Sequence, residues 1–133
     1  MAADDHYLDN EERTVVFIMT SGPSTPSRCA TPFYLGSVLA AMDAEVHIFF
    51  TMEGVKLVEK GVADDLVAMQ GGKKVIDFIR DAKRAGVTLH VCEPALPGYR
   101  IEAETDLIDD VDHVSRASVL ADLILTCDKV ITF

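Results

Sequence analysis

Three apolar runs of strand length constrain the fold of this chain more than any other feature. They are Thr14–Met19, Val46–Phe50 and Val87–Cys92. Each run is apolar almost throughout, without the strict alternation of a strand that has one face in water. A continuous apolar run of this length is typical of a strand buried on both faces, as in a parallel sheet covered by helices.

Two segments between these runs have the spacing of amphipathic helices. Their apolar residues are Leu35, Val38, Leu39 and Met42 in the first, and Val75, Phe78, Ile79 and Ala82 in the second. Weaker patterns predict strands over 111–115 and 129–133, with a helix around 120–124 between them. Strands that alternate with helices pair in parallel through right-handed crossovers. The sequence therefore predicts a three-layer α/β/α sandwich with a mainly parallel five-stranded sheet.

The chain of 133 residues has the length of one domain with a core of its own. Residues 1–12 are polar and acidic, so we expect a disordered acidic tail followed by a single domain over 13–133. No apolar run approaches the ~20 residues that span a bilayer, and the start lacks the features of a signal peptide. The three cysteines are odd in number and widely spaced, which favours reduced thiols. We therefore expect a cytoplasmic protein.

The net charge of −10 argues against nucleic acid and against anionic membranes as partners. Acidic residues cluster in Asp4–Glu12 and Glu102–Asp112, whereas basic residues cluster in Lys73–Arg84. These clusters are either solvated faces or complementary surfaces of neighbouring subunits. Apolar residues at 57–58 and 67–69 lie beside weak helices, where a monomer would leave them uncovered. On these grounds we expect a homo-oligomer.

Cys92 is the main candidate for chemistry. It ends the third apolar run and opens a loop, Glu93–Gly98, that is rich in proline and glycine. In open α/β sheets, ligands and reactive groups gather at the carboxyl ends of the strands. Helix N-termini at that edge lower the pKa of a thiol, while Glu93 opposes this effect. A structural role for Cys92 remains an alternative.

The loop after the first run contributes further candidates at the same edge. Cys29 lies in this loop and becomes a neighbour of Cys92 if the two loops meet, which would make it an auxiliary thiol. Thr20, Ser21 and Gly22 open a hydroxyl-rich stretch similar to the phosphate-binding loops of flavin proteins. Two prolines in this stretch, however, remove backbone N–H donors.

A metal site is the other chemistry to consider. His90 lies two residues before Cys92 and so shares its strand face, and together with Cys29 it suggests a metal site. The sequence nevertheless contains no C-x-x-C or H-x-x-x-H pattern, and His47 and His113 are scattered along the chain. Cys127 continues an apolar helical stripe and is expected to be a small buried residue. We therefore expect no metal and no cofactor.

Four segments in this order resemble the DsrE/DsrF-like sulfur-relay family, which includes the Tus proteins of tRNA thiolation. They are residues 14–20, 40–51, 85–92 and 121–133. The resemblance implies that the cysteine ending the third strand accepts sulfane sulfur as a persulfide and passes it on. Within this chain that role falls on Cys92 alone. The resemblance also implies sulfur donor and acceptor proteins as partners, and an oligomer.

The leading hypothesis is therefore a small cytoplasmic sulfur-carrier or sulfurtransferase-like protein that acts through a persulfide on Cys92. One alternative is a non-catalytic oligomeric α/β binding module in which the cysteine is incidental. The other is a flavin- or phosphate-binding protein that uses Thr20, Ser21 and Gly22.

Overall fold

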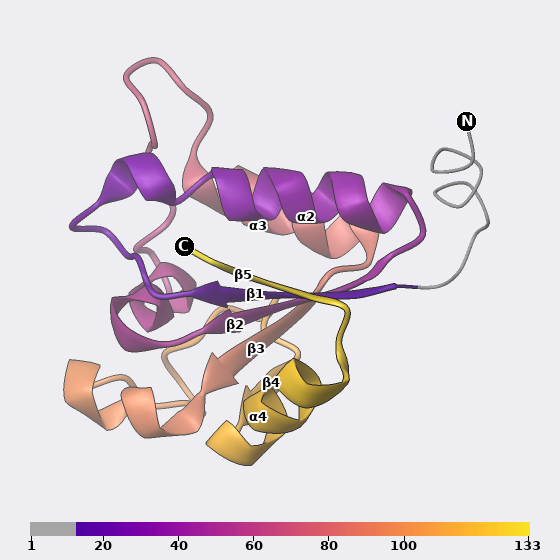
Figure 1. The fold of residues 1–133 in the computed structure, drawn as a ribbon. Helices are drawn as coiled ribbons and strands as arrows, with labels where there is room; N and C mark the ends of the chain where they lie inside the picture. Colours follow the sequence, from indigo (N-terminus) through magenta and orange to yellow (C-terminus); the bar gives the residue numbers. More distant parts are fainter. Residues whose placement is uncertain (1–12) are drawn as a thin grey trace.

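The computed structural model describes residues 13–133, and the predicted tail over 1–12 lies outside the described residues. Five strands form one sheet in the order β4-β3-β2-β1-β5 (Figure 1). The strands are β1 (Thr14–Met19), β2 (Glu45–Phe50), β3 (Thr88–Cys92), β4 (His113–Ser115) and β5 (Lys129–Thr132). Every neighbouring pair is parallel, so the predicted α/β fold with a parallel five-stranded sheet is confirmed.

Helices lie on both faces of the sheet (Figure 1). The helices α2 (Thr31–Ala41) and α3 (Val75–Ala85) lie side by side over one face, and α4 (Ala117–Thr126) lies on the other. Short 3₁₀ turns complete the chain: η1 (Pro26–Arg28), η2 (Met52–Val58), η3 (Glu93–Ala95) and η4 (Pro97–Tyr99). None of the helices described over 13–133 is both long enough and apolar enough to cross a membrane.

The main core lies between the sheet and the α2/α3 layer. Alternate strand residues such as Phe17, Ile48 and Leu89 point into it and are fully buried. Phe33 of α2 stacks on Phe50 at the end of β2, with ring centroids 5.9 Å apart. Because side chains alternate along a strand, the residues between these core positions face α4.

The predicted face of α2 is only partly correct, since Leu35 and Leu39 pack against the core while the other two predicted residues do not. Pro32, Phe33 and Gly36 are buried, whereas Val38 and Met42 are exposed. Gly36 allows the helix to approach the sheet, since a Cβ at this position would already lie 3.5 Å from Val46. Sequence periodicity is judged from apolar side chains. It therefore misses the contact at Gly36, which forms because this residue has no side chain.

The apolar residues at 57–58, expected to be uncovered in a monomer, are not on the surface. The segment around 54–60 forms the 3₁₀ turn η2, and its Leu57 and Val58 are fully buried in the main core. They therefore do not form the uncovered surface from which an oligomer was expected. The acidic stretch over 101–110 forms turns.

Candidate functional site

Cys92 is the last residue of β3 and leads directly into η3. It is partly exposed, and its backbone is extended, with φ −73° and ψ 110°. Alternation along β3 places its side chain on the same face of the sheet as that of His90. Its register partner in the neighbouring strand β4 is Ser115. Cys92 thus lies at the carboxyl edge of the sheet, as the sequence predicted.

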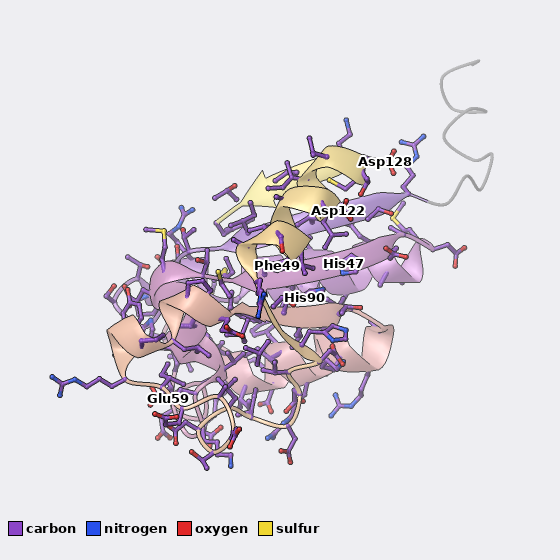
Figure 2. The ribbon with its side chains drawn as sticks, turned by 90° about the horizontal axis from the view of Figure 1, so that it is seen from below. His47, Phe49, Glu59, His90, Asp122 and Asp128 are labelled. Atoms are coloured by element: carbon purple, nitrogen blue, oxygen red, sulfur yellow. The ribbon has the colours of Figure 1, made fainter. Side chains whose placement is uncertain are left out.

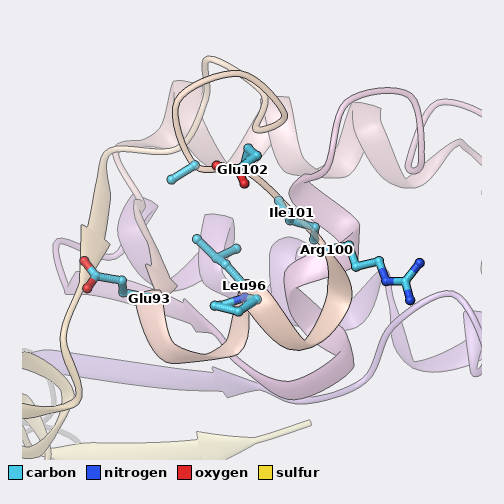
Figure 3. Close-up of a pocket in the computed structure, with 7 residues that line it drawn as sticks. Glu93, Leu96, Arg100, Ile101 and Glu102 are labelled. Carbon is cyan, nitrogen blue, oxygen red and sulfur yellow. The ribbon is translucent and has the colours of Figure 1, made fainter.

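A shallow pocket of about 470 Å³ lies beside the loop that follows Cys92 (Figure 3). Its lining residues are Glu93, Leu96, Pro97, Arg100, Ile101, Glu102 and Ala103. Glu93 stands at one side, and the guanidinium of Arg100 extends away from it at the other (Figure 3). The floor is apolar and the rim carries both signs of charge, which suits the docking of a polypeptide segment beside the loop that follows Cys92.

Cys29 is fully buried and belongs to the main core between the sheet and α2 and α3. Its thiol donates to the carbonyl oxygen of Gly22 at 3.3 Å. Burial, reinforced by the carboxylate of Glu53, raises the pKa of Cys29 to about 11, although Arg28 acts in the opposite direction. Cys29 is therefore a neutral thiol at physiological pH and a poor nucleophile.

The structure does not bring Cys29 and Cys92 together. Cys29 follows β1 and Cys92 ends β3, and β2 lies between these two strands. Cys29 belongs to the core under α2, whereas Cys92 faces the α4 side of the sheet. The third cysteine, Cys127, is partly exposed and lies between α4 and the amino end of β5, so it is at the opposite edge of the sheet from Cys92.

The loop after β1 uses its own hydrogen-bond donors internally. The backbone N–H and the hydroxyl of Thr20 both donate to the carbonyl oxygen of Phe133, at 2.7 and 2.8 Å, and the Ser21 N–H donates to it at 3.2 Å. The Ser24 N–H donates to the Glu53 carboxylate at 2.7 Å, and the Ser24 hydroxyl donates to its other oxygen.

Gly22 is packed so closely against Glu53 that a Cβ at this position would already overlap the Glu53 backbone. The loop therefore leaves no room for a phosphate beside Gly22. Hydrogen bonds from Ser24 keep the pKa of Glu53 below its usual range, so its carboxylate remains charged. A negative side chain therefore occupies the position that a phosphate would take, which argues against phosphate binding by this loop.

Histidines from three strands meet on the α4 side of the sheet, and the expectation that they are scattered was wrong. His47 of β2 and His90 of β3 share a hydrogen bond of 2.9 Å between Nδ1 and Nε2 (Figure 2). His113 of β4 is the register partner of His90, with ring centroids 5.1 Å apart. Phe49 stacks on His90 at 4.2 Å with nearly parallel rings.

This cluster escaped sequence reasoning because its members lie far apart in the chain. Each histidine falls in a predicted strand, and β2, β3 and β4 are neighbours in the sheet. A prediction of strand order would therefore have found them, whereas a search for short motifs could not.

The hydrogen bonds continue from the histidines in both directions. The other ring nitrogen of His47, Nε2, lies 2.8 Å from a carboxylate oxygen of Glu45. The other ring nitrogen of His90, Nδ1, lies 3.3 Å from the hydroxyl of Ser115. An unbroken row of polar contacts thus runs from the amino end of β2 to the carboxyl end of β4.

His90 is 5% exposed, and its environment disfavours the charged imidazolium. Burial, together with His47 and His113, lowers the pKa of His90 to about 4, while Asp112 acts in the opposite direction. His90 is consequently neutral at physiological pH. Within residues 13–133, no three side chains of His, Cys, Asp or Glu converge as metal ligands would. In particular, the combination of His90 with Cys29 is not formed, because they face opposite sides of the sheet.

Comparison with solved structures shows which proteins share this fold. The crystal structure of the ychN protein from E. coli matches with a TM-score of 0.75 and 19% sequence identity, over 92% of this chain and 100% of that chain. MTH1491 from Methanobacterium thermoautotrophicum, a protein of unknown function, matches with a TM-score of 0.60 and 15% identity, over 92% and 100% of the two chains. BT1422 from Bacteroides thetaiotaomicron, also of unknown function, matches with a TM-score of 0.60 and 14% identity, over 91% and 95%.

No curated protein matches the chain. The sequence pattern of the DsrE/DsrF-like family, by contrast, matches residues 13–133, which is the whole part of the chain that the structure describes. The resemblance that the four sequence segments indicated therefore extends over the complete sheet and its helices. The chain belongs to the DsrE/DsrF-like family.

Proposed function

We propose that this protein is a small cytoplasmic sulfur carrier that holds sulfane sulfur as a persulfide on Cys92. Membership of the DsrE/DsrF-like family suggests a role in sulfur relay in general. The observation that supports Cys92 as the carrier is its position: a partly exposed cysteine at the carboxyl end of β3, followed directly by the loop that lines an open pocket.

The other two thiols fit this role less well. Cys29 is fully buried and has a pKa of about 11, so neither a donor protein nor a base reaches it. Cys127 lies at the amino end of β5, away from the edge where the loops and pocket of the sheet are found. Only Cys92 combines exposure with a place at the carboxyl edge.

The transfer needs little machinery beyond this thiol. The Cys92 thiolate attacks the outer sulfur of a donor persulfide, so that an S–S bond to Cys92 forms while the S–S bond within the donor breaks. The donor leaves as a thiolate. An acceptor thiolate then attacks the outer sulfur on Cys92 in the same way, and Cys92 is released as the thiolate.

Partners follow from this chemistry. We propose a donor protein and an acceptor protein that each present a cysteine to the pocket beside Cys92. We also propose a homo-oligomer, because α4 is apolar yet has no buried residue, and its Leu125 is 85% exposed. The exposed apolar residues of α4, and not the buried residues at 57–58, are therefore the surface that a second copy of the chain would cover.

Intact-mass measurement after incubation with a persulfide donor tests the proposed function. We expect wild type and the matched variants Cys29→Ser and Cys127→Ser to gain the mass of one sulfur atom, and Cys92→Ser to gain none. Equal uptake by wild type and Cys92→Ser would refute the proposal. Loss of uptake only in Cys29→Ser would move the site to that residue.

The exposed apolar helix also favours a second candidate, a non-catalytic oligomeric binding module. Absence of sulfur uptake by every variant, together with a stable oligomer, would favour this candidate.

A further inference from the structure

We propose that the surface depression between β4 and the first turn of α4 binds a small organic monocarboxylate, with Arg116 holding the carboxylate and Val114 and Val119 contacting its apolar body. We call this depression the β4/α4 pocket. Its volume of about 590 Å³ exceeds that of the pocket at the loop after β3 and lies in the range of small-molecule sites. The site goes beyond the proposed function, because neither Cys92 nor a persulfide takes part in it.

The β4/α4 pocket is lined by the buried polar residues of the fold. Among residues 13–133, the only buried polar residues are His90 and Ser115, at 5% and 7% exposed, and both line this pocket. His90 lies on the side of the sheet that carries α4 (Figure 2). Burying polar side chains costs free energy, so two of them at one cavity indicate a binding site more than plain packing.

Ser115 retains capacity for a ligand. Its hydroxyl lies 3.3 Å from Nδ1 of His90, which is the one hydrogen bond of this side chain within the described part of the chain. A hydroxyl has one donor and two acceptor positions, so two of the three remain for a molecule in the pocket.

Arg116 supplies the positive charge of the β4/α4 pocket. It is exposed, it directly precedes α4, and no carboxylate within residues 13–133 forms an ion pair with it. Among the residues that line the pocket it is the only lysine or arginine. A guanidinium binds a carboxylate through two parallel N–H donors. Burial lowers the pKa of His90 to about 4, so this residue adds no second charge.

Neutral donors complete the surroundings of the carboxylate. The hydroxyl of Ser118 and the imidazole N–H of His113 belong to exposed residues that line the same pocket. The N-cap of α4 makes no side-chain hydrogen bond, and the first backbone N–H groups of a helix have no acceptor within it. These groups stabilise an anion, and they add to a site that the arginine and the buried side chains already define.

Asp112 limits the charge that the pocket accepts. Burial acts to raise the pKa of Asp112, but hydrogen bonds from Lys83 and from the backbone N–H of Leu89 lower it below its usual range. The carboxylate is therefore ionised, and each of its oxygens lies 2.6 Å from the Lys83 ammonium. It lines the same pocket as Arg116. A dianion such as phosphate is repelled by this carboxylate, whereas a monocarboxylate is matched by the single arginine.

Two valines provide a surface for the apolar part of the ligand. Val114 of β4 and Val119 of α4 line the pocket and are 38% and 41% exposed. Because α4 buries none of its residues, it leaves the space beside β4 unfilled. An apolar ligand body removes both side chains from water, which is favourable. The pocket therefore selects a molecule with a carboxylate at one end and an alkyl or aromatic group at the other.

Benzoate tests the site, because it is a monocarboxylate with a rigid apolar body. We expect a titration of the isotope-labelled full chain with benzoate, followed by NMR, to shift the backbone amide resonances of Ser115 and Ser118 until they saturate. Benzyl alcohol, which lacks the charge, and inorganic phosphate, which lacks the apolar body and has the greater charge, are the ligand controls. Both should bind at least about tenfold more weakly than benzoate.

Substitution of the arginine identifies the group that holds the carboxylate. Arg116→Gln should weaken benzoate binding about tenfold, since it removes a charged hydrogen-bond partner. Arg116→Lys keeps the charge without the paired donors, so its affinity should lie between those of wild type and Arg116→Gln. Arg100→Gln is the matched control, because it removes an exposed arginine from the pocket at the loop after β3 and should bind benzoate as wild type does.

Four results would overturn the proposal. They are the absence of saturable shifts with benzoate, unchanged affinity in folded Arg116→Gln, an equal loss of affinity in Arg100→Gln, and binding of benzyl alcohol or phosphate as tight as that of benzoate. If Arg116→Gln does not fold, Arg116→Lys takes its place, and wild-type affinity in that variant would show that paired donors are not used. Sulfur uptake by Cys92 is measured separately, so the proposed function and this site can fail independently.

Discussion

Cys29 and Cys92 face opposite sides of the sheet, one in the core under α2 and the other at the carboxyl end of β3. This separation excludes a disulfide between them in the native fold, because β2 lies between the strands they follow. It also assigns them opposite reactivity, since only Cys92 is exposed.

Brief alkylation of the native protein should therefore modify Cys92 and spare Cys29. The thiol of Cys29 is fully buried and its pKa is raised to about 11, so almost none of it is thiolate at pH 7. Peptide mapping by mass spectrometry measures the labelling of each residue. Labelling in denaturant is the control and should modify both cysteines, whereas equal rates in the native protein would contradict the burial of Cys29.

Gly54→Ala should destabilise the protein by about 2 kcal/mol or more. A Cβ at Gly54 would overlap the backbone carbonyl oxygen of Met19, and a backbone atom at the end of a central strand cannot move aside cheaply. The free energy of unfolding in urea measures the loss. Gly98→Ala is the matched control, because a Cβ at Gly98 meets nothing within 4 Å. Equal stability of the two variants would show that η2 can shift away from β1.

A charge on α4 should weaken the proposed oligomer. Leu125 is 85% exposed on a helix with no buried residue, so Leu125→Arg should leave the fold intact and shift the mass measured by light scattering toward the monomer. Tyr34→Arg is the control, since Tyr34 is also exposed, at 63%, but lies on α2 over the opposite face of the sheet. A wild-type protein that is monomeric at micromolar concentration would refute the oligomer itself.

The sheet was predictable because its strands are apolar runs of the right length. Thr14–Met19 was predicted to the residue, and the parallel pairing followed from the alternation of strands and helices. Not all of the buried face of α2 was predictable in this way, because a glycine, Gly36, makes the closest approach to the sheet. The 3₁₀ conformation of η2 was not predictable either, because the spacing of its apolar residues also fits a short α-helix.

The site was predictable only where local sequence determines position. Cys92 ends an apolar run, so its place at the carboxyl edge followed from the strand itself. The expected proximity of Cys29 to Cys92 depended on the path of the long loop after the first strand. Local sequence patterns do not determine that path. The contact between His47 and His90 depends on strand order and register across 43 residues, and it becomes visible only in three dimensions.

The stability of the protein should depend on pH through His90. Its pKa is about 4 in the native state against 6.5 for an unperturbed histidine, so the unfolded chain binds this proton more readily. The stabilising contribution of neutral His90 is therefore complete above about pH 6.5 and is lost as the pH falls toward 4. The full loss amounts to roughly 3 kcal/mol, from the shift between the two pKa values.

His90→Gln isolates this contribution, because glutamine is polar but does not titrate. We expect the free energy of unfolding in urea to fall more steeply between pH 6.5 and 4 for wild type than for His90→Gln. Glu53, whose pKa is also lowered, owes this to Ser24 and not to His90, so its contribution is the same in both proteins and cancels in the comparison. His113→Gln should fall slightly less steeply than wild type, because His113 is one of the groups that lower the pKa of His90. Parallel curves for wild type and His90→Gln would mean that His90 accepts a proton in the folded protein as easily as in the unfolded chain.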